Sequence, residues 1–260
     1  MKKTILSTAM VAAYLTLSSQ GVTILPGDPL NPGLSAGQSF QLVFVTSTRV
    51  RGDSVDATPN DGLDTSTSAD WNNYVNSVAS SSGTTALAGL AWSAIVSVQN
   101  RSNPSDLGVA AKVNAPVLAD VYNTNSAGSQ LVATAANFYT SNHLLPILFG
   151  EDGNAINTQG GSGAGRLVWT GSTGTGDIDS RPLGNSPISS TGNNGSRTGN
   201  APASNDDWIN RSDAERRGPT TPLRVYALSE LITIAAPIPE PSTTILGAFG
   251  ALLLLLRRRN

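Results

Sequence analysis

The segment FQLVFVTST, residues 40–48, predicts the first structural element of this 260-residue chain. Apolar and polar residues alternate in its first half, and its second half is rich in β-branched residues, a pattern typical of a β-strand. The Pro- and Gly-rich sequence before it, residues 22–39, predicts an extended lead-in. The Asp- and Ser-rich sequence after it, residues 49–68, predicts a surface loop, in which we attribute the tripeptide Arg51-Gly52-Asp53 to chance.

The segment SADWNNYVNSVASSSG, residues 68–83, has the clearest helical pattern in the chain. Ser68 is the expected N-cap, and Asp70 places an acid in the first turn, where the helix dipole favours it. Four apolar residues recur at helical spacing and define one apolar face: Trp71, Tyr74, Val75 and Val78. Gly83 is expected to end the helix.

The rest of the chain predicts short strands separated by loops. The expected strands are residues 92–98, 117–122, 129–133, 166–172 and 222–231. Residues 171–199 are mostly Gly, Ser, Thr and Asn and predict a long excursion without regular structure, after which Trp208 is expected to anchor the chain. These elements add up to one α+β domain over residues 40–231, with its termini near one another.

Charge and cysteine content exclude several kinds of site. The chain has no cysteine and one histidine, His143, which excludes disulfides, thiolate metal sites and zinc sites that need two histidines. Five of the 16 basic residues lie at the two ends of the chain, which leaves 11 basic residues against 18 acidic ones. A surface of this charge does not favour nucleic acid, so no nucleic-acid partner is expected.

The first 21 residues have the pattern of a signal peptide. Two lysines precede a moderately apolar run, residues 5–17, and the small residues Ser19 and Gly21 suit a cleavage site. The mature chain would then begin at Val22 beyond the inner membrane, whereas a non-cleaved anchor is the alternative.

The last 24 residues, PIPEPSTTILGAFGALLLLLRRRN, differ in composition from the rest of the chain. Residues 245–256 contain no polar side chain and predict a short transmembrane helix, because a buried core helix, the alternative, would show a polar face. The run Arg257, Arg258 and Arg259 follows directly. By the positive-inside rule, it predicts a C-terminus that stays cytoplasmic before processing.

Pro239, Glu240 and Pro241 stand just before this apolar span, on a segment that the two prolines keep extended. The order of tripeptide, apolar span and arginine run resembles the PEP-CTERM sorting signal of Gram-negative bacteria. The resemblance covers residues 237–260 and implies that the tripeptide is recognised by an exosortase, an integral membrane processing enzyme. It also implies association with exopolysaccharide and biofilm matrix.

A second resemblance rests on the order of the motifs FVTST, ADWNNYV, LAGLAWSAIVS, LVWTGS, DDWI and RVYALSE. This order is similar to that of exported bacterial domains related to C-type-lectin-like folds. It implies a single lectin-like domain with long irregular loops, in which these aromatic residues mostly pack the core: Trp92, Trp169, Trp208 and Tyr226. The chain departs from true C-type lectins because it lacks their cysteines and their sugar-reading Glu-Pro-Asn or Gln-Pro-Asp tripeptide.

No catalytic constellation stands out in the sequence. His143 lies beside an apolar run, and we interpret it as a partly buried structural residue rather than a catalytic base. The acids Glu151 and Asp152, like Asp177 and Asp179, are interpreted as solvated loop residues rather than as a glycosidase pair. We therefore expect a protein that is not an enzyme, with a secreted hydrolase as the least favoured alternative.

No cofactor is expected, and calcium is the one ion that the sequence could accommodate. Hard cations take several oxygen ligands from flexible loops. The candidates that border the Gly-rich region are Asp177, Asp179, Asn205, Asp206 and Asp207, among which Asp206 and Asp207 are the predicted calcium or ligand residues. The leading hypothesis is a non-enzymatic exported protein of the cell envelope or extracellular matrix, and the alternative is a carbohydrate-binding surface module.

Overall fold

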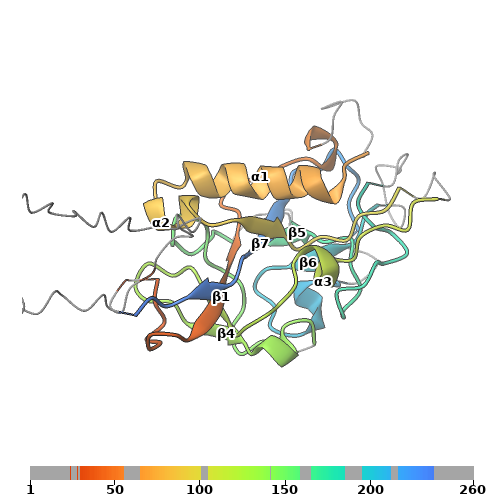
Figure 1. The fold of residues 1–260 in the computed structure, drawn as a ribbon. Helices are drawn as coiled ribbons and strands as arrows, with labels where there is room; N and C mark the ends of the chain where they lie inside the picture. Colours follow the sequence, from red (N-terminus) through yellow and green to blue (C-terminus); the bar gives the residue numbers. More distant parts are fainter. Residues whose placement is uncertain are drawn as a thin grey trace, which may run out of the picture.

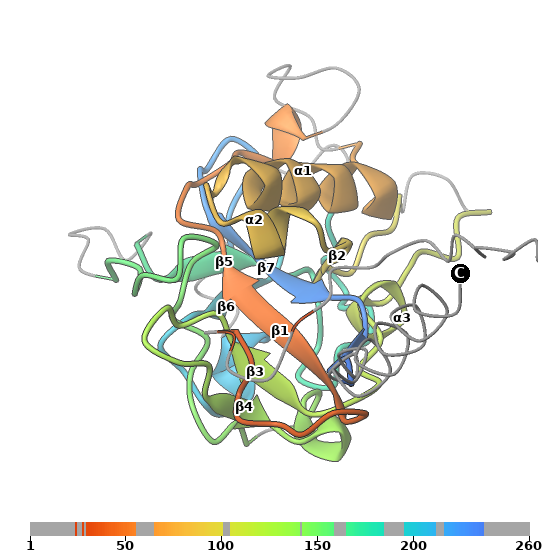
Figure 2. The ribbon, with the colours of Figure 1, turned by 60° about the vertical axis from the view of Figure 1, so that its left-hand side comes forward.

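The protein combines a curled mixed sheet with a few short helices (Figure 1). The computed structural model describes residues 24, 28, 30–55, 65–100, 105–140, 142–158, 165–184, 195–211 and 216–236. The longest helix, α1 (Ser68–Ser81), lies over one face of the sheet, and irregular segments cover the other face (Figure 2). The expected mixture of α and β structure is confirmed.

Two strands form the centre of the sheet, and the others are short. The central strands are β1 (Ser39–Val45) and β7 (Arg224–Ser229). The remaining strands are β2 (Trp92–Ala94), β3 (Val121–Asn123), β4 (Leu131–Ala133), β5 (Leu167–Trp169), β6 (Thr198–Asn200) and β8 (Ile232–Thr233). The short helices are η1 (Gly52–Ser54), α2 (Thr85–Ala88), α3 (Ala111–Asn114), η2 (Ala135–Asn137) and η4 (Asp206–Trp208).

The strand predicted from FQLVFVTST is β1, and it is buried on both faces because α1 packs over one face of the sheet and irregular segments pack over the other. Phe40, Leu42 and Phe44 join the core beneath α1. Val43 and Val45 point the other way, into a second core against the irregular segments. The alternation of side chains along one strand therefore divides the apolar interior into two layers.

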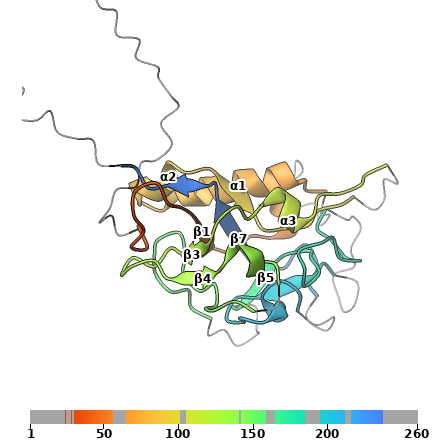
Figure 3. The same cartoon turned by 60° about the horizontal axis from the view of Figure 1, so that its bottom comes forward.

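The sheet order is β4-β3-β1-β7-β5-β6, with β2 also paired to β7 and β8 also paired to β1. The β1–β3 and β5–β7 pairs are parallel, and the other pairs are antiparallel. Because β1 pairs with the last strands, the described chain ends lie together, and the backbone amide of Ala235 donates to the carbonyl of Ile24 at 3.3 Å (Figure 3). The expected proximity of the termini is confirmed.

Helix α1 has the predicted apolar face, but its cap differs from the prediction. The N-cap is Thr67, whose hydroxyl accepts from the Asp70 amide at 3.3 Å while the Asp70 carboxylate accepts from the Thr67 amide at 2.8 Å. This reciprocal capping box places Ser68 inside the first turn instead. Gly83 follows the helix with a φ of +74°, a conformation that a glycine adopts without strain.

Asparagine side chains of α1 and α3 form hydrogen bonds with the backbone of β2, along the edge that faces away from β7. The Asn76 amide group accepts from the Trp92 N–H at 3.0 Å and donates to the Trp92 carbonyl at 2.7 Å. Asn72 accepts from the Ala94 N–H at 2.8 Å, and Asn114 donates to the Ala94 carbonyl at 2.7 Å. Asn72 and Asn76 stand one helical turn apart, so together they satisfy alternate residues of an edge strand, as a neighbouring strand would.

Removing the Asn76 amide group should therefore destabilise the domain. We expect Asn76→Ala to lower the free energy of unfolding by about 2 kcal/mol, because it leaves the amide and the carbonyl of Trp92 without their partner. Urea unfolding followed by tryptophan fluorescence measures the loss. Asn73→Ala, at an exposed position of the same helix, is the matched control, and an equal loss in both variants would contradict the role of Asn76.

Most of the strand predictions are confirmed, and the errors concern the late part of the chain. Strands β4 and β5 lie within the predicted segments 129–133 and 166–172, and β3 overlaps the predicted segment 117–122 but ends one residue later, at Asn123. The segment 222–231 contains β7 but is not the last strand, since β8 follows it and pairs with β1. The supposed irregular excursion ends in β6, which pairs with β5.

The loop around Arg51 is less exposed than predicted. Asp53 is fully buried in η1 and pairs with the Arg51 guanidinium at 2.5 Å. The Arg51-Gly52-Asp53 tripeptide thus forms an internal ion pair, because its acid turns towards the domain, whereas the sequence predicted a surface loop.

Candidate functional site

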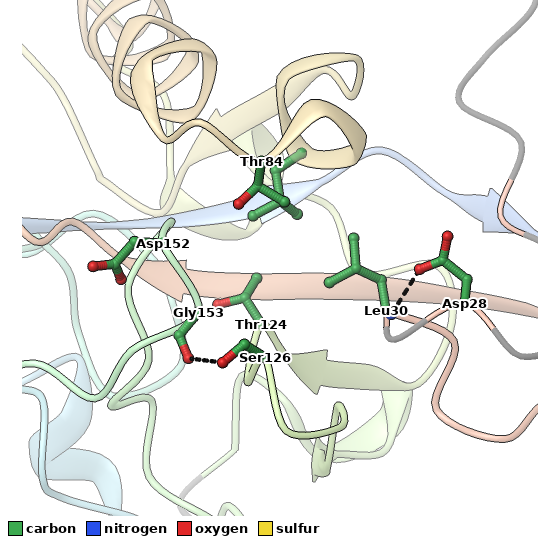
Figure 4. A pocket seen from close by; sticks show the side chains of 8 residues that line it. Asp28, Leu30, Thr84, Thr124, Ser126, Asp152 and Gly153 are labelled. Atoms are coloured by element: carbon green, nitrogen blue, oxygen red, sulfur yellow. Dashed lines mark hydrogen bonds between the residues drawn. The ribbon is translucent and has the colours of Figure 1, made fainter.

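A pocket of about 350 Å³ lies near the carboxyl ends of the parallel strands β1 and β3 (Figure 4). Parallel strands end at the same edge of a sheet, so the residues that follow them come close together in space. The pocket is lined by Asp28, Leu30, Thr84, Leu87, Thr124, Ser126, Asp152 and Gly153. We call it the β1–β3 pocket.

One wall of the pocket is a turn, residues 149–155, that β1 holds in place. The backbone amide of Val45 donates to the Phe149 carbonyl at 3.0 Å. The Glu151 carboxylate accepts from the backbone amide of Ser47 at 2.8 Å and also from the Ser47 hydroxyl. These bonds leave Asp152, the next residue, exposed at the pocket.

Gly153 lets this turn approach the segment after β3. It has a φ of +74°, and an added Cβ would lie 2.8 Å from the Ser126 Cβ and 3.1 Å from the Thr124 carbonyl oxygen. The Thr124 hydroxyl donates to the Gly150 carbonyl at 2.8 Å, and the Ser126 hydroxyl bonds the Gly153 carbonyl at 3.3 Å. The wall is therefore built by close backbone contact that only glycine permits at this position.

The sequence correctly placed Glu151 and Asp152 on a turn but was wrong to treat both as solvated. Glu151 is buried, because its two oxygens bind the main chain and side chain of Ser47. Asp152 is exposed, and its carboxylate accepts from the backbone and side-chain nitrogens of Asn154 at 3.0 and 3.1 Å. Only Asp152 of this pair is available to a ligand.

The structure also separates Asp177 from Asp179. Asp177 is half-buried and pairs with Lys112 at 2.6 Å, and the hydrogen bond from Lys112 lowers the pKa of this carboxyl group. Asp179 is buried and pairs with Arg197 at 3.1 Å, with Arg216 at 3.8 Å. The prediction that Asp179 is a solvated loop acid was wrong, since distant arginines enclose it.

Asp206 and Asp207, the predicted calcium or ligand residues, lie in η4. Asp206 is exposed and Asp207 is half-buried. The loop after β5 approaches them, since a Cβ on Gly174 would lie 3.4 Å from the Asp206 Cβ. The two acids of that loop face Lys112 and Arg197 instead, and the described parts of the chain contain no group of three acidic or histidine side chains suited to a metal ion.

His143 lies in a buried aromatic cluster. Its ring centroid is 4.4 Å from that of Trp208 and 5.1 Å from that of Phe138, on which it stacks. Its Nε2 bonds the Phe138 carbonyl at 2.9 Å, and a carbonyl only accepts, so Nε2 carries the proton. Nδ1 is then an unprotonated, buried nitrogen without a hydrogen-bond partner among the described residues.

This environment predicts a stability that depends on pH below neutrality. Burial lowers the pKa of His143, and the bond to the Phe138 carbonyl only partly opposes that effect. The unfolded chain therefore binds the proton more readily, and stability should fall as the pH drops through the unfolded value of about 6.5, by at most about 1.4 kcal/mol per pH unit. The loss should level off below the lowered folded pKa.

Urea unfolding at about pH 7.5 and about pH 5.5 measures this dependence above the range in which most carboxylates titrate. His143→Phe is the comparison, because it retains an aromatic ring and removes the titrating group from a chain with one histidine. The difference in stability between the two pH values should shrink in this variant. An unchanged difference would mean that another group carries the dependence.

The predicted sorting residues lie outside the described part of the structure. These are Pro239, Glu240 and Pro241 together with Arg257, Arg258 and Arg259. Residues 1–21, the predicted signal peptide, and the apolar span 245–256 also lie outside it. Among the residues that are described, no helix has both the length and the apolar character needed to cross a bilayer.

Comparison with known protein families, with curated proteins and with solved structures gives no match to this chain.

The β1–β3 pocket was not predicted from the sequence, because its residues come from four separate segments. The closest signal was the turn sequence that contains Glu151 and Asp152.

Proposed function

We propose that this chain is an exported, non-enzymatic protein of the cell surface or extracellular matrix. It is carried across the inner membrane by residues 1–21 and sorted by residues 237–260, with an exosortase-type enzyme as its processing partner and exopolysaccharide as its surroundings. The observation that carries the proposal is the joint order of the Pro239-Glu240-Pro241 tripeptide, the apolar span and the three terminal arginines.

The arrangement of the domain supports a tether at its C-terminal end. The hydrogen bond between Ala235 and Ile24 holds the two described chain ends together at one side of the sheet (Figures 1 and 3). A signal peptide before this domain and a membrane tail after it would therefore attach to the same side. Residues 237–244 would then separate the domain from the proposed apolar anchor.

Replacing the acid of the tripeptide tests the sorting step. We expect Glu240→Ala to abolish processing in the native host, so that an immunoblot shows the longer, membrane-retained form. Deletion of Arg257 to Arg259 should instead alter membrane retention, because it removes the charges that hold the C-terminus inside. Glu230→Gln, in the domain ten residues earlier, is the matched control. Unchanged size and location in both tail variants would refute the proposal.

We propose as a second candidate that the domain is C-type-lectin-like and binds carbohydrate. Its support is the pairing of the first strand with the last strands and the position of two helices directly after the first strand and its loop. The aromatic residues that the resemblance assigns to the core are all buried: Trp92, Trp169, Trp208 and Tyr226.

A glycan array separates the two candidates, since sorting alone predicts no glycan binding. If the lectin-like function holds, the full chain should retain a defined set of glycans, and calcium should be tested in the same array. The combined change Asp206→Ala and Asp207→Ala should abolish that binding if these acids form the site. If the array retains no glycan, the lectin-like candidate is refuted and only the proposed role in the matrix remains.

A further inference from the structure

We infer that an apolar groove beside the end of β7 rests on the surface of the lipid bilayer while the domain is tethered there. We call it the Leu118–Leu231 groove. Its volume is about 250 Å³, and its lining is mainly aliphatic: Ala91, Ala115, Pro116, Leu118, Leu228 and Leu231. The inference rests on the proposed function, because it takes residues 245–256 as the membrane anchor.

Two exposed leucines meet on this groove. Leu118 is 64% exposed and Leu231 is 43% exposed, and both contribute to the lining although they lie far apart in the sequence. Leucines exposed singly are common on soluble proteins, whereas two that share one apolar groove form a patch. Covering this patch with an apolar surface removes it from water, which is favourable.

The polar groups of the groove are already engaged within the protein. The Gln41 side-chain amide donates to the carbonyls of Pro116 and Ser229 at 3.2 and 2.8 Å, and its oxygen accepts from the Leu118 amide at 2.6 Å. The Ser229 hydroxyl donates to the Glu230 carbonyl at 2.7 Å. These groups offer little to a polar ligand, so the groove suits an apolar occupant.

Both leucines are held in place before anything covers them. The bond from its backbone amide to Gln41 fixes the main chain at Leu118. Beside Leu231, the Glu230 amide donates to the Ala91 carbonyl at 2.8 Å, and the Glu230 carboxylate accepts from the Ala91 amide at 3.1 Å. A surface that is ordered in advance loses little conformational entropy when it is covered.

The position of the chain end favours a bilayer as the occupant. Leu231 directly precedes β8, and Ala236 is the last described residue, so the groove lies within about 18 Å of the point at which the tail leaves. Residues 237–244 then span at most about 29 Å before the apolar segment begins. A domain of about 200 residues has a radius of gyration of about 16 Å, so a linker of this length keeps it against the membrane.

The tether also explains how two leucines can be sufficient. A short linker turns contact with the bilayer into an intramolecular step with a high effective concentration, so a weak apolar contact is populated. None of the described residues that line the groove is Lys or Arg, the residues that attract anionic headgroups. The contact should therefore depend on insertion of aliphatic side chains and should form on a zwitterionic bilayer.

Site-specific fluorescence tests this contact, because the chain has no cysteine of its own. Leu118→Cys is labelled with bimane in the full-length chain, which is reconstituted in vesicles of phosphatidylcholine with and without brominated acyl chains. We expect brominated lipid to quench this label, and high salt should leave the quenching unchanged. The matched control is Leu107→Cys, which is 87% exposed and outside the groove, and it should not be quenched.

Two further variants separate the groove from the anchor. Ala251→Cys places the label inside the apolar segment, so its quenching reports the anchor alone. Leu231→Ser, added to Leu118→Cys, should lower the quenching at position 118 towards that of the Leu107→Cys control, because it removes the second leucine of the groove. Leu144→Ser, at another exposed leucine, should not change it. Circular dichroism confirms that each variant is folded.

Quenching at position 251 without quenching at position 118 would overturn the inference and leave the anchor standing. Quenching at position 118 without quenching at position 251 would support the groove and refute the anchor. A blue-shifted label at position 118 that brominated lipid does not quench would mean that protein covers the groove, which overturns the inference. Loss of the quenching in high salt would overturn it as well, since the contact would then be electrostatic.

Discussion

Gly199→Ala is expected to lower the stability of the domain strongly. Gly199 is the central residue of β6, and an alanine Cβ there would overlap the carbonyl oxygen of Trp208 and lie 2.8 Å from its carbonyl carbon. Both atoms belong to the backbone, so no side-chain rotation relieves the clash. Overpacking usually costs about 1–3 kcal/mol, and we expect a loss at or above the upper end of that range.

Thermal unfolding followed by near-ultraviolet circular dichroism measures this loss, since Trp208 lies in the buried aromatic cluster. Gly174→Ala is the matched control, because its Cβ would make an ordinary contact at 3.4 Å and the residue does not need a positive φ. The control should lose less than about 1 kcal/mol. Comparable melting temperatures for the two variants would show that β6 and η4 do not pack as described.

Arg224→Met is the second substitution for which we expect a large loss, of about 3 kcal/mol or more. The Arg224 side chain is buried at the start of β7, and its guanidinium donates to the Thr46 carbonyl at 2.5 Å and also to the Ser47 carbonyl. Its Nε donates to the Gly165 carbonyl at 3.3 Å. Methionine fills the space but leaves these carbonyls without their charged donor.

Burial lowers the pKa of the Arg224 guanidinium, and repulsion from the positive charge of Arg49 is the second largest cause of this shift. The guanidinium nevertheless stays protonated near neutral pH. Arg224→Lys should not restore stability, because one ammonium cannot reach carbonyls of two separate segments in the geometry of a guanidinium. Equilibrium urea unfolding compares both variants with the unchanged chain.

Lys112→Met is the matched control for the loss of a cation. Lys112 and its partner Asp177 are 45% and 49% exposed, and exposed ion pairs contribute about 0–1 kcal/mol. The control should therefore lower the free energy of unfolding by less than about 1 kcal/mol. A loss for Arg224→Met no larger than that for Lys112→Met would mean that the Arg224 contacts do not support the end of β1.

The candidate site shows where prediction from the sequence stopped. The turn around Glu151 was predicted, because Gly, Asp and Asn there favour a turn whatever the rest of the chain does. The burial of Glu151 was not, since it depends on Ser47, more than 100 residues away in sequence. The same separation hides the β1–β3 pocket, whose residues lie between Asp28 and Gly153.

Local patterns were sufficient for α1 and for most of the strands. Helical spacing, β-branched runs and apolar segments act through near neighbours in the sequence, so they can be read without the fold. Helices α2 and α3, of four residues each, were missed because so short an element shows no period.

The parallel pairing of β1 with β3, the asparagine pairing of β2 and the enclosure of Asp179 by arginines all required the folded chain. Each joins segments whose contact depends on loop closure and on the packing of both cores, and no local preference encodes it. The sequence therefore identified the long helix and most of the strands. The long-range contacts established which acidic side chains are buried with partners, as Glu151 and Asp179 are, and which stay exposed, as Asp152 does.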